Sequence, residues 1–219
     1  MYNLAFDTTG QSCSVILTQD GITLEKSVKK MDFGQAEVLL PTIRSILDNH
    51  NITMSELDLI TVCTGPGSFT GVRSSLSAAR TFGLALPETG LTGVSSFEAY
   101  VEDINPDELA EINAVIIETK REDFYVQLFD IHKKPLTPPQ ALNYADIIDK
   151  LRNHKVTLVG DGVERFLSQP SGLSLHVIRM EEMLSITALA RCGNNRYTKK
   201  CLDYPKPLYL RAPDVCVKA

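Results

Sequence analysis

The residues of this chain best suited to chemistry lie in a turn that is rich in glycine. The turn runs from Thr64 to Arg73 and reads TGPGSFTGVR. It separates an apolar run typical of a strand from a longer run typical of a helix. Glycines let the backbone N–H groups of such a turn converge on one point. The turn therefore suits either an anion or the close approach of a neighbouring backbone.

The glycine spacing differs from that of the common nucleotide and hydrolase motifs. A P-loop needs a lysine after its last glycine, whereas Val72 follows Gly71 here. Gly65, Gly67 and Gly71 are spaced G-x-G-x-x-x-G rather than G-x-G-x-x-G. Ser68 does not lie in the G-x-S-x-G frame of a hydrolase. The residues alone predict a tight strand-to-helix turn without a specific activity.

The other reactive residues do not indicate a metal or nucleophile site. No two of the four histidines are at metal-ligand spacing; they are His50, His132, His154 and His176. No nucleophile–base pair is visible. The five cysteines form no C-x-x-C pair, which is typical of reduced thiols in a cytosolic protein. The sequence thus predicts no resident metal.

Length and charge limit the class of protein. A chain of 219 residues, 43% of them hydrophobic, can bury the core of one large domain or two small ones. A net charge of −5 disfavours free-standing nucleic-acid binding, which usually needs a basic surface. The first residues read as a strand, so we expect no signal segment, and no apolar run approaches the roughly 20 residues that cross a membrane. We expect a cytoplasmic protein without a membrane span.

The elements that would position the glycine turn form two mixed α/β units. Strands are predicted over residues 2–6, 13–18, 22–28, 57–62, 91–94, 114–117, 124–129 and 156–159, and helices over residues 39–47, 72–86 and 184–192. Pro41 predicts that the first helix is kinked or starts late. The acidic segment 102–108 predicts a boundary between lobes of residues 1–104 and 105–219. The C-terminal tail could return to the first lobe.

The glycine turn closely resembles the T-G-P-G-S-F-T-G-[LV]-R signature of the bacterial TsaB (YeaZ) family. Asp7-Thr8-Thr9 resembles the D-T-[ST] that follows the family's first strand, and residues 207–214 resemble its C-terminal segment. Residues 37–41 resemble its H-S-E-x-L-L-P segment, but Gln35 and Ala36 replace the His-Ser pair. The resemblance implies a two-lobed actin-like, Hsp70-like, sugar-kinase-like (ASKHA) α/β architecture.

The resemblance also implies a function in the synthesis of threonylcarbamoyladenosine in tRNA. The chain would be a non-catalytic scaffold that activates a TsaD-type transferase and docks a TsaE-type ATPase. It would form a homodimer when alone and contact tRNA only indirectly. The related TsaD (Kae1) transferases bind a metal through H-x-x-x-H, and the matching positions here are Ser96 and Tyr100. Neither side chain is a good ligand for such a metal, so transferase activity by this chain alone is not expected.

Two helices of this family form a face that binds the partner or a second copy. In the second predicted helix, the residues that share one face become smaller toward its C-terminal end, as a close contact with another helix requires. Together these predict partner contacts at Glu37, Leu40, Ile43, Val72, Leu76, Ala79 and Gly83. The alternative is that the same stripe packs inside the subunit.

An active ASKHA ATPase or phosphotransferase is the competing hypothesis. It would use Asp7 and the Gly65–Gly71 loop. The resemblance instead implies a degraded nucleotide site, in which Asp7, Thr8, Gly65, Gly67 and Ser68 are vestigial and ATP or ADP binds weakly at most. Residue types favour an Asx-turn at Asp7, with the carboxylate capping the backbone two residues on. The segments 118–121 and 160–162 correspond to nucleotide-clamp positions of ASKHA proteins and are expected to be structural.

Overall fold

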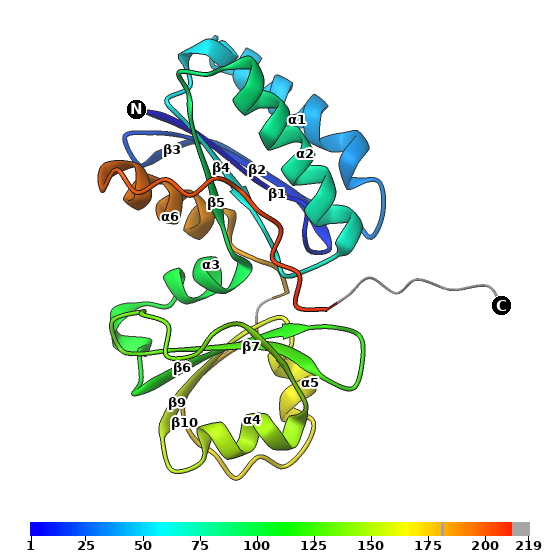
Figure 1. The fold of residues 1–219 in the computed structure, drawn as a ribbon, viewed down its shortest axis with the longest axis vertical. Coiled ribbons are helices and arrows are strands. Elements are labelled where there is room, and N and C mark those ends of the chain that lie inside the picture. The colour runs from blue at the N-terminus through cyan, green and yellow to red at the C-terminus, as the bar shows by residue number, and fades with distance from the viewer. Residues whose placement is uncertain (181, 212–219) are drawn as a thin grey trace, which may run out of the picture.

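The computed structural model describes residues 1–180 and 182–211, which form two lobes (Figure 1). The first lobe contains a five-stranded sheet in the order β3-β2-β1-β4-β5. Its strands are β1 (Tyr2–Asp7), β2 (Ser12–Gln19), β3 (Ile22–Lys30), β4 (Leu59–Cys63) and β5 (Gly90–Val94). The first three strands form an antiparallel meander, and β4 and β5 run parallel to β1. The carboxyl ends of β1, β4 and β5 therefore meet at one edge of the sheet.

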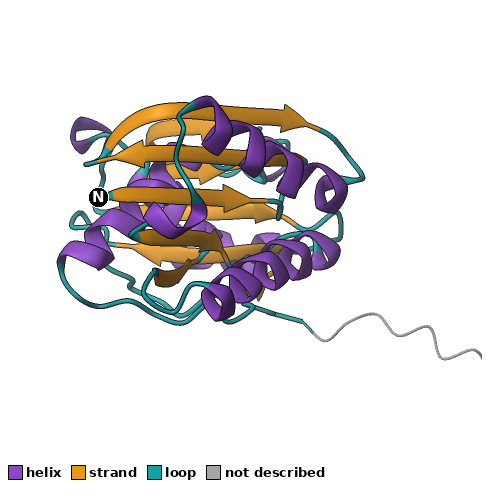
Figure 2. Ribbon diagram, turned by 90° about the horizontal axis from the view of Figure 1, so that it is seen from above, coloured by secondary structure: helices purple, strands orange, loops and turns teal. Residues whose placement is uncertain are grey.

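Helices cover both faces of this sheet. One face packs against α1 (Gln35–Asn49) and α2 (Phe69–Ala85), and the other against α3 (Ser96–Glu102) and α6 (Ile186–Thr198). Figure 2 shows the helices lying on either side of the strands. Among the described residues, no helix is long and apolar enough to cross a membrane.

The second lobe repeats the strand arrangement of the first. Its strands are β6 (Ile112–Glu118), β7 (Phe124–Phe129), β8 (Gln140–Leu142), β9 (Lys155–Gly160) and β10 (Ser174–Met180), in the order β10-β9-β6-β7-β8. Read from β8, this is again an antiparallel meander followed by two parallel strands. The helices α4 (Tyr144–Leu151) and α5 (Val163–Leu167) pack on its outer face. The β6–β7 turn is therefore the counterpart of the β1–β2 turn.

Three features differ from the sequence prediction. Helix α1 does not start late: it begins at Gln35 and includes Pro41, whose ring lies on the exposed side. The sequence pattern missed α3, β8, α4, α5 and β10, which are short or half-exposed. The segment 105–219, predicted as one lobe, contributes to both lobes, because α6 packs on the first sheet rather than the second. The second sheet itself ends at Met180.

The chain after α6 runs along the first lobe as an extended segment. We call residues 199–211 the strap; Figure 1 shows it in orange and red, crossing toward the N-terminal end of α2. Gly93 donates its N–H to the carbonyl of Asp203 at 2.9 Å, and Leu208 donates to the carbonyl of Thr64 at 2.9 Å. Arg211 then forms an ion pair with Asp123 of the second lobe. The strap thus joins the lobes. Residues 212–214 of the family-like C-terminal segment lie outside the described residues.

Candidate functional site

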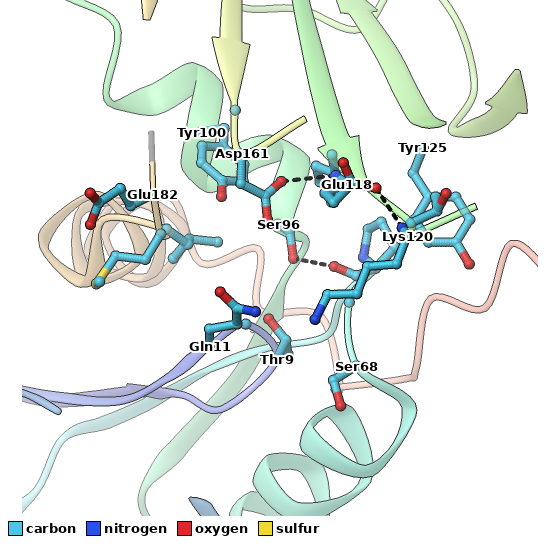
Figure 3. A pocket seen from close by; sticks show the side chains of 18 of the residues that line it. Thr9, Gln11, Ser68, Ser96, Tyr100, Glu118, Lys120, Tyr125, Asp161 and Glu182 are labelled. Atoms are coloured by element: carbon cyan, nitrogen blue, oxygen red, sulfur yellow. Dashed lines mark hydrogen bonds between the residues drawn. The ribbon is translucent and has the colours of Figure 1, made fainter. Parts of the chain in front are cut away.

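A cavity of about 1120 Å³ lies between the two lobes. Its lining comes from the β1–β2 turn, the glycine turn and α3 on one side, and from the β6–β7 turn and the end of β9 on the other. Figure 3 shows the side chains that converge there, which include Thr9, Gln11, Ser68, Ser96, Tyr100, Glu118, Lys120, Tyr125, Asp161 and Glu182. The repeated topology accounts for this arrangement, because it brings equivalent turns of the two lobes face to face.

The glycine turn packs against the backbone of the β1–β2 turn. A Cβ atom added to Gly71 would lie 1.9 Å from the carbonyl oxygen of Thr8, and one added to Gly67 would lie 2.5 Å from that of Thr9. Ser68 donates its N–H to the Thr9 carbonyl at 2.7 Å, and the Thr8 hydroxyl donates to the Gly71 carbonyl at 2.7 Å. The sequence predicted that the glycine turn accommodates either an anion or a neighbouring backbone. The structure shows the close approach of a neighbouring backbone.

Asp7 adopts the Asx-turn. It is 2% exposed, and its Oδ1 accepts the N–H of Thr9 at 2.8 Å. Burial raises the pKa of this carboxyl, and the hydrogen bonds from Thr9 oppose that rise. Asp7, Thr8 and Gly65 do not line the cavity, whereas Gly67 and Ser68 do. The carboxylate that the ATPase hypothesis assigns to Mg²⁺-nucleotide is therefore enclosed in its own turn.

The second lobe presents a polar wall to the cavity. Glu118 accepts two hydrogen bonds from Arg165, at 2.6 and 2.9 Å. Burial opposes ionisation of Glu118, but the hydrogen bonds and charge of Arg165, together with the backbone N–H groups of Thr119 and Lys120, outweigh it, and the pKa of Glu118 is lowered. Asp161 accepts the N–H of Glu118 at 2.9 Å, and its burial raises its pKa to about 6. Lys120 has a φ of 56° and points its side chain into the cavity (Figure 3).

The positions that match the transferase metal ligands lie at the inner end of the cavity. Ser96 donates its hydroxyl to the carbonyl of Pro66 at 2.8 Å, and its Oγ lies 3.3 Å from the Sγ of Cys63. Tyr100 is 4% exposed. Burial raises the pKa of the Cys63 thiol, which disfavours a thiolate ligand. In the part of the chain that the structure describes, no three potential ligands cluster closely enough to hold a metal ion.

The structure corrects most of the predicted partner contacts. Ile43, Val72, Leu76 and Ala79 are between 0 and 4% exposed and belong to the core between the sheet and the two outer helices. They are therefore buried within the subunit and unavailable to a partner. Gly83 also packs closely within the subunit, because a Cβ added at this position would lie 2.7 Å from the Leu91 side chain.

Two of the predicted contact residues, Glu37 and Leu40, do lie at the surface. Leu40 borders a groove of about 570 Å³ between α1 and α2. Its lining consists of Ala36, Leu39, Leu40, Phe69, Thr70, Arg73, Ser74, Ser77, Ala78, Thr81 and Phe82. Leu40 is 51% exposed and Phe69 is 44% exposed. Phe69 belongs to the glycine signature, but its exposure in the groove is not visible from the sequence.

Comparison with known proteins agrees with this arrangement. A family model described as "TsaD: tRNA N6-adenosine threonylcarbamoyltransferase" matches residues 34–167, more than half of the chain. A relative from Buchnera aphidicola, named tRNA threonylcarbamoyladenosine biosynthesis protein TsaB, is 28% identical over 171 residues, which cover 74% of this chain and 76% of the relative. The solved structure of YeaZ from Pseudomonas aeruginosa has a TM-score of 0.81 at 21% identity and covers 95% of this chain and 99% of that one.

A more distant structure shares the architecture. Ethanolamine utilization protein EutJ from Carboxydothermus hydrogenoformans has a TM-score of 0.51 at 12% identity, covering 86% of this chain and 88% of that one. The repeated sheets, with turns facing across a cleft, define a two-lobed α/β protein of the ASKHA class. Within that class, the chain belongs to the TsaB (YeaZ) family.

Proposed function

We propose that this chain is a non-catalytic, activating subunit in the synthesis of threonylcarbamoyladenosine in tRNA. The names of its relatives support the pathway. In the proposed reaction, a TsaD-type transferase moves a threonylcarbamoyl group from its adenylate to N6 of adenosine 37. This chain would hold the transferase in its active arrangement and contribute no reacting group.

The α1–α2 groove is the observation that carries this proposal. It is lined mainly by apolar and small side chains, and both Leu40 and Phe69 expose large apolar surface at it. Such a groove between two long helices suits the helical face of another subunit. The TsaD family model also matches this chain, so the transferase would bring a related fold and a comparable pair of helices to the contact. We therefore assign the groove to the transferase, with homodimers forming through it when the transferase is absent.

The interlobe cavity supports the non-catalytic part of the proposal. Asp7 is committed to the Thr9 backbone, and Ser96 and Tyr100 occupy the positions of the transferase metal ligands. In this proposal the protein is cytoplasmic, has no resident metal, docks a TsaE-type ATPase and needs no nucleotide of its own. Weak binding of ATP or ADP in the cleft would be compatible with it.

Reconstitution of the modification tests the proposal. The mixture contains an adenylate synthase, a TsaD-type transferase, a TsaE-type ATPase and unmodified tRNA, with or without this chain. We expect modified tRNA only when the chain is present, and no ATP turnover by the chain alone. Equal product without the chain would contradict an activating role. ATP turnover by the chain, abolished by Asp7→Ala, would instead favour an ATP-dependent enzyme.

A further inference from the structure

Positive charge is concentrated along α2 and the strap. These two segments carry six basic residues, Arg73, Arg80, Lys199, Lys200, Lys206 and Arg211, and one acidic residue, Asp203. Their net charge is therefore +5, in a chain whose net charge is −5. The charge of the whole chain hides this local excess.

Aromatic side chains lie among these cations. The ring of Tyr209 lies 5.3 Å from that of Phe69, and the guanidinium of Arg73 lies 5.3 Å from the centroid of the same Phe69 ring. The guanidinium of Arg80 lies 5.7 Å from the Tyr204 ring. Phe69, Tyr204 and Tyr209 are 44, 57 and 45% exposed, so ring surface remains accessible after these contacts.

The cations are free to bind an anion from outside. Among the described residues, no carboxylate forms an ion pair with Arg73, Arg80 or the three strap lysines. Arg73 and the three lysines are exposed, and Arg80 is half-buried. The acidic Asp203 is already paired with Arg196, at 3.4 Å. Arg211 is paired with Asp123 and is left out of the proposed surface.

Structural roles explain only part of this pattern. Lys199 and Lys200 follow the last turn of α6, where positive charge complements the helix dipole. Arg80 donates to the Pro205 carbonyl at 2.8 and 3.2 Å and so holds the strap. Neither role accounts for Lys206, or for the rings of Tyr204 and Tyr209, which lie outside the α1–α2 groove and remain half in solvent. A surface that combines free cations with accessible rings is typical of single-stranded nucleic-acid binding.

We propose that this α2–strap surface binds a single-stranded segment of RNA. Bases would stack on Tyr204 and Tyr209, and phosphates would contact Lys206 and the two lysines that begin the strap. Phe69 and Arg73 line the α1–α2 groove and are left to the transferase. The eleven residues from Lys199 to Tyr209 span at most about 36 Å, which is long enough for a track of several nucleotides. The inference rests on the proposed function, which makes the RNA the tRNA being modified. It replaces the expectation that the chain meets tRNA only indirectly.

The test uses the chain in complex with its TsaD-type transferase. Binding of an unmodified tRNA transcript and of a single-stranded RNA oligonucleotide is measured by fluorescence anisotropy at several salt concentrations. The test variant changes all three strap lysines to Glu: Lys199→Glu, Lys200→Glu and Lys206→Glu. The matched control, Lys26→Glu, Lys150→Glu and Lys155→Glu, makes the same change of charge at exposed positions on β3, α4 and β9.

We expect the strap variant to bind both RNAs at least about tenfold more weakly, and the control to bind within about twofold of the unchanged complex. The slope of log K against log salt should fall by roughly 2, at about 0.7 for each lost phosphate contact. Ultraviolet cross-linking of the unchanged complex should attach RNA to Tyr204 or Tyr209. Equal weakening by both variants, absence of RNA binding, or cross-links confined to other surfaces would each overturn the proposal.

Size-exclusion chromatography separates this proposal from the proposed function. The strap variant should assemble with the transferase as the unchanged chain does. Its unfolding temperature should fall by less than about 5 °C, because none of the three lysines forms an ion pair in the described chain and only Lys199 and Lys200 lie at the C-terminal end of the α6 dipole. Loss of assembly with RNA binding intact would mean that the surface docks an acidic protein, and the RNA proposal would be wrong. Failure of the unchanged chain to assemble with the transferase would count against the proposed function instead.

Discussion

The two lobes share one strand arrangement but differ in their outer helices. In the first lobe, β4 leads into a helix of 17 residues, α2, which lies beside the 15-residue α1. In the second lobe, β9 leads into a helix of only five residues, α5. The short helix covers less of its sheet. Ile178 and Met180 of β10 are 43 and 54% exposed, whereas Leu91 of β5 packs against the core beneath α1 and α2. The long helices, by contrast, create the groove and one wall of the strap surface.

The equivalent hairpins differ in electrostatics as well. Asp7 ends β1 and Glu118 ends β6, and each accepts the N–H of the residue two positions on. Burial raises the pKa of Asp7, and no cation among the described residues forms an ion pair with it. Arg165 and two backbone N–H groups together lower the pKa of Glu118 despite its burial. The same place in a repeated fold can thus hold a carboxyl whose charge is disfavoured or one whose charge is stabilised.

Substitution of the turn glycines should give the largest difference between the lobes. In Gly71→Ala the new methyl group would meet the Thr8 carbonyl at 1.9 Å, and in Gly162→Ala the nearest atom, the Glu118 nitrogen, is 3.0 Å away. We expect Gly71→Ala to lower the free energy of unfolding by about 3 kcal/mol or more, and Gly162→Ala by about 1 kcal/mol. Urea denaturation measures both.

Gly10→Ala is the control, because nothing lies within 4 Å of the Cβ that it would add. Its free energy of unfolding should stay within about 0.5 kcal/mol of that of the unchanged chain. Equal stability of the Gly71 and Gly162 variants would show that the first-lobe turn can relax away from the β1–β2 turn.

A carboxylate introduced on the exposed apolar surface of each lobe should show whether the transferase binds the α1–α2 groove or any exposed apolar surface. Leu40→Asp introduces a carboxylate into the α1–α2 groove, and Ile178→Asp introduces one on β10. We expect the first to weaken binding of the TsaD-type transferase by about 100-fold, as at an interface hot spot, and the second to leave it unchanged. Isothermal titration calorimetry measures the affinity. Similar losses for both variants would assign the transferase to a surface that spans the lobes.

The sequence predicted the first lobe better than the second. Its strands and long helices have strong apolar periodicity, and the glycine signature marks the β4–α2 turn. The second lobe relies on α5 and β8, which are too short for a periodic signal, and on β10, which alternates between half-buried and exposed residues.

The candidate sites show a related limit of sequence reasoning. A stripe of small and apolar residues cannot reveal which side of a helix faces the core, so the sequence leaves open whether Val72, Leu76 and Ala79 contact a partner or the sheet beneath. The strap surface depends on residues more than 100 positions apart, such as Arg80 and Tyr204. No local pattern joins them, and the charge of the whole chain points the other way.

The pH dependence of stability should have opposite signs for the two second-lobe carboxyls. The pKa of Asp161 is raised from 3.8 to about 6, so the folded chain holds a proton there that the unfolded chain releases. Its stabilising contribution is therefore complete below the unfolded value and is lost as pH rises through 6. The pKa of Glu118 is lowered from 4.5, so its contribution is present above that value and is lost as pH falls below it.

Conservative amide variants test these signs. Asp161→Asn should raise the free energy of unfolding at pH 7 by about 2 kcal/mol and flatten its fall between pH 4 and 6, because the uncharged amide oxygen can still accept the Glu118 N–H. Glu118→Gln should lower the free energy of unfolding at pH 7 and reduce its dependence on pH near 4. Urea denaturation across this range measures both. The same sign of change at pH 7 for both variants would contradict the assigned pKa shifts.

The helix N-caps should give the smallest difference between the lobes. Ser68 caps the long helix α2, but its Oγ accepts the Gly71 N–H at 3.4 Å, which is long for a hydrogen bond. Asn143 caps the shorter α4 with a bond of 2.9 Å to the N–H of Asp146. We expect Ser68→Ala to lower the free energy of unfolding by less than about 0.5 kcal/mol and Asn143→Ala by about 1 kcal/mol. The reverse order would mean that the length of the capped helix, rather than the geometry of its cap, decides the cost, and urea denaturation of the two variants measures which holds.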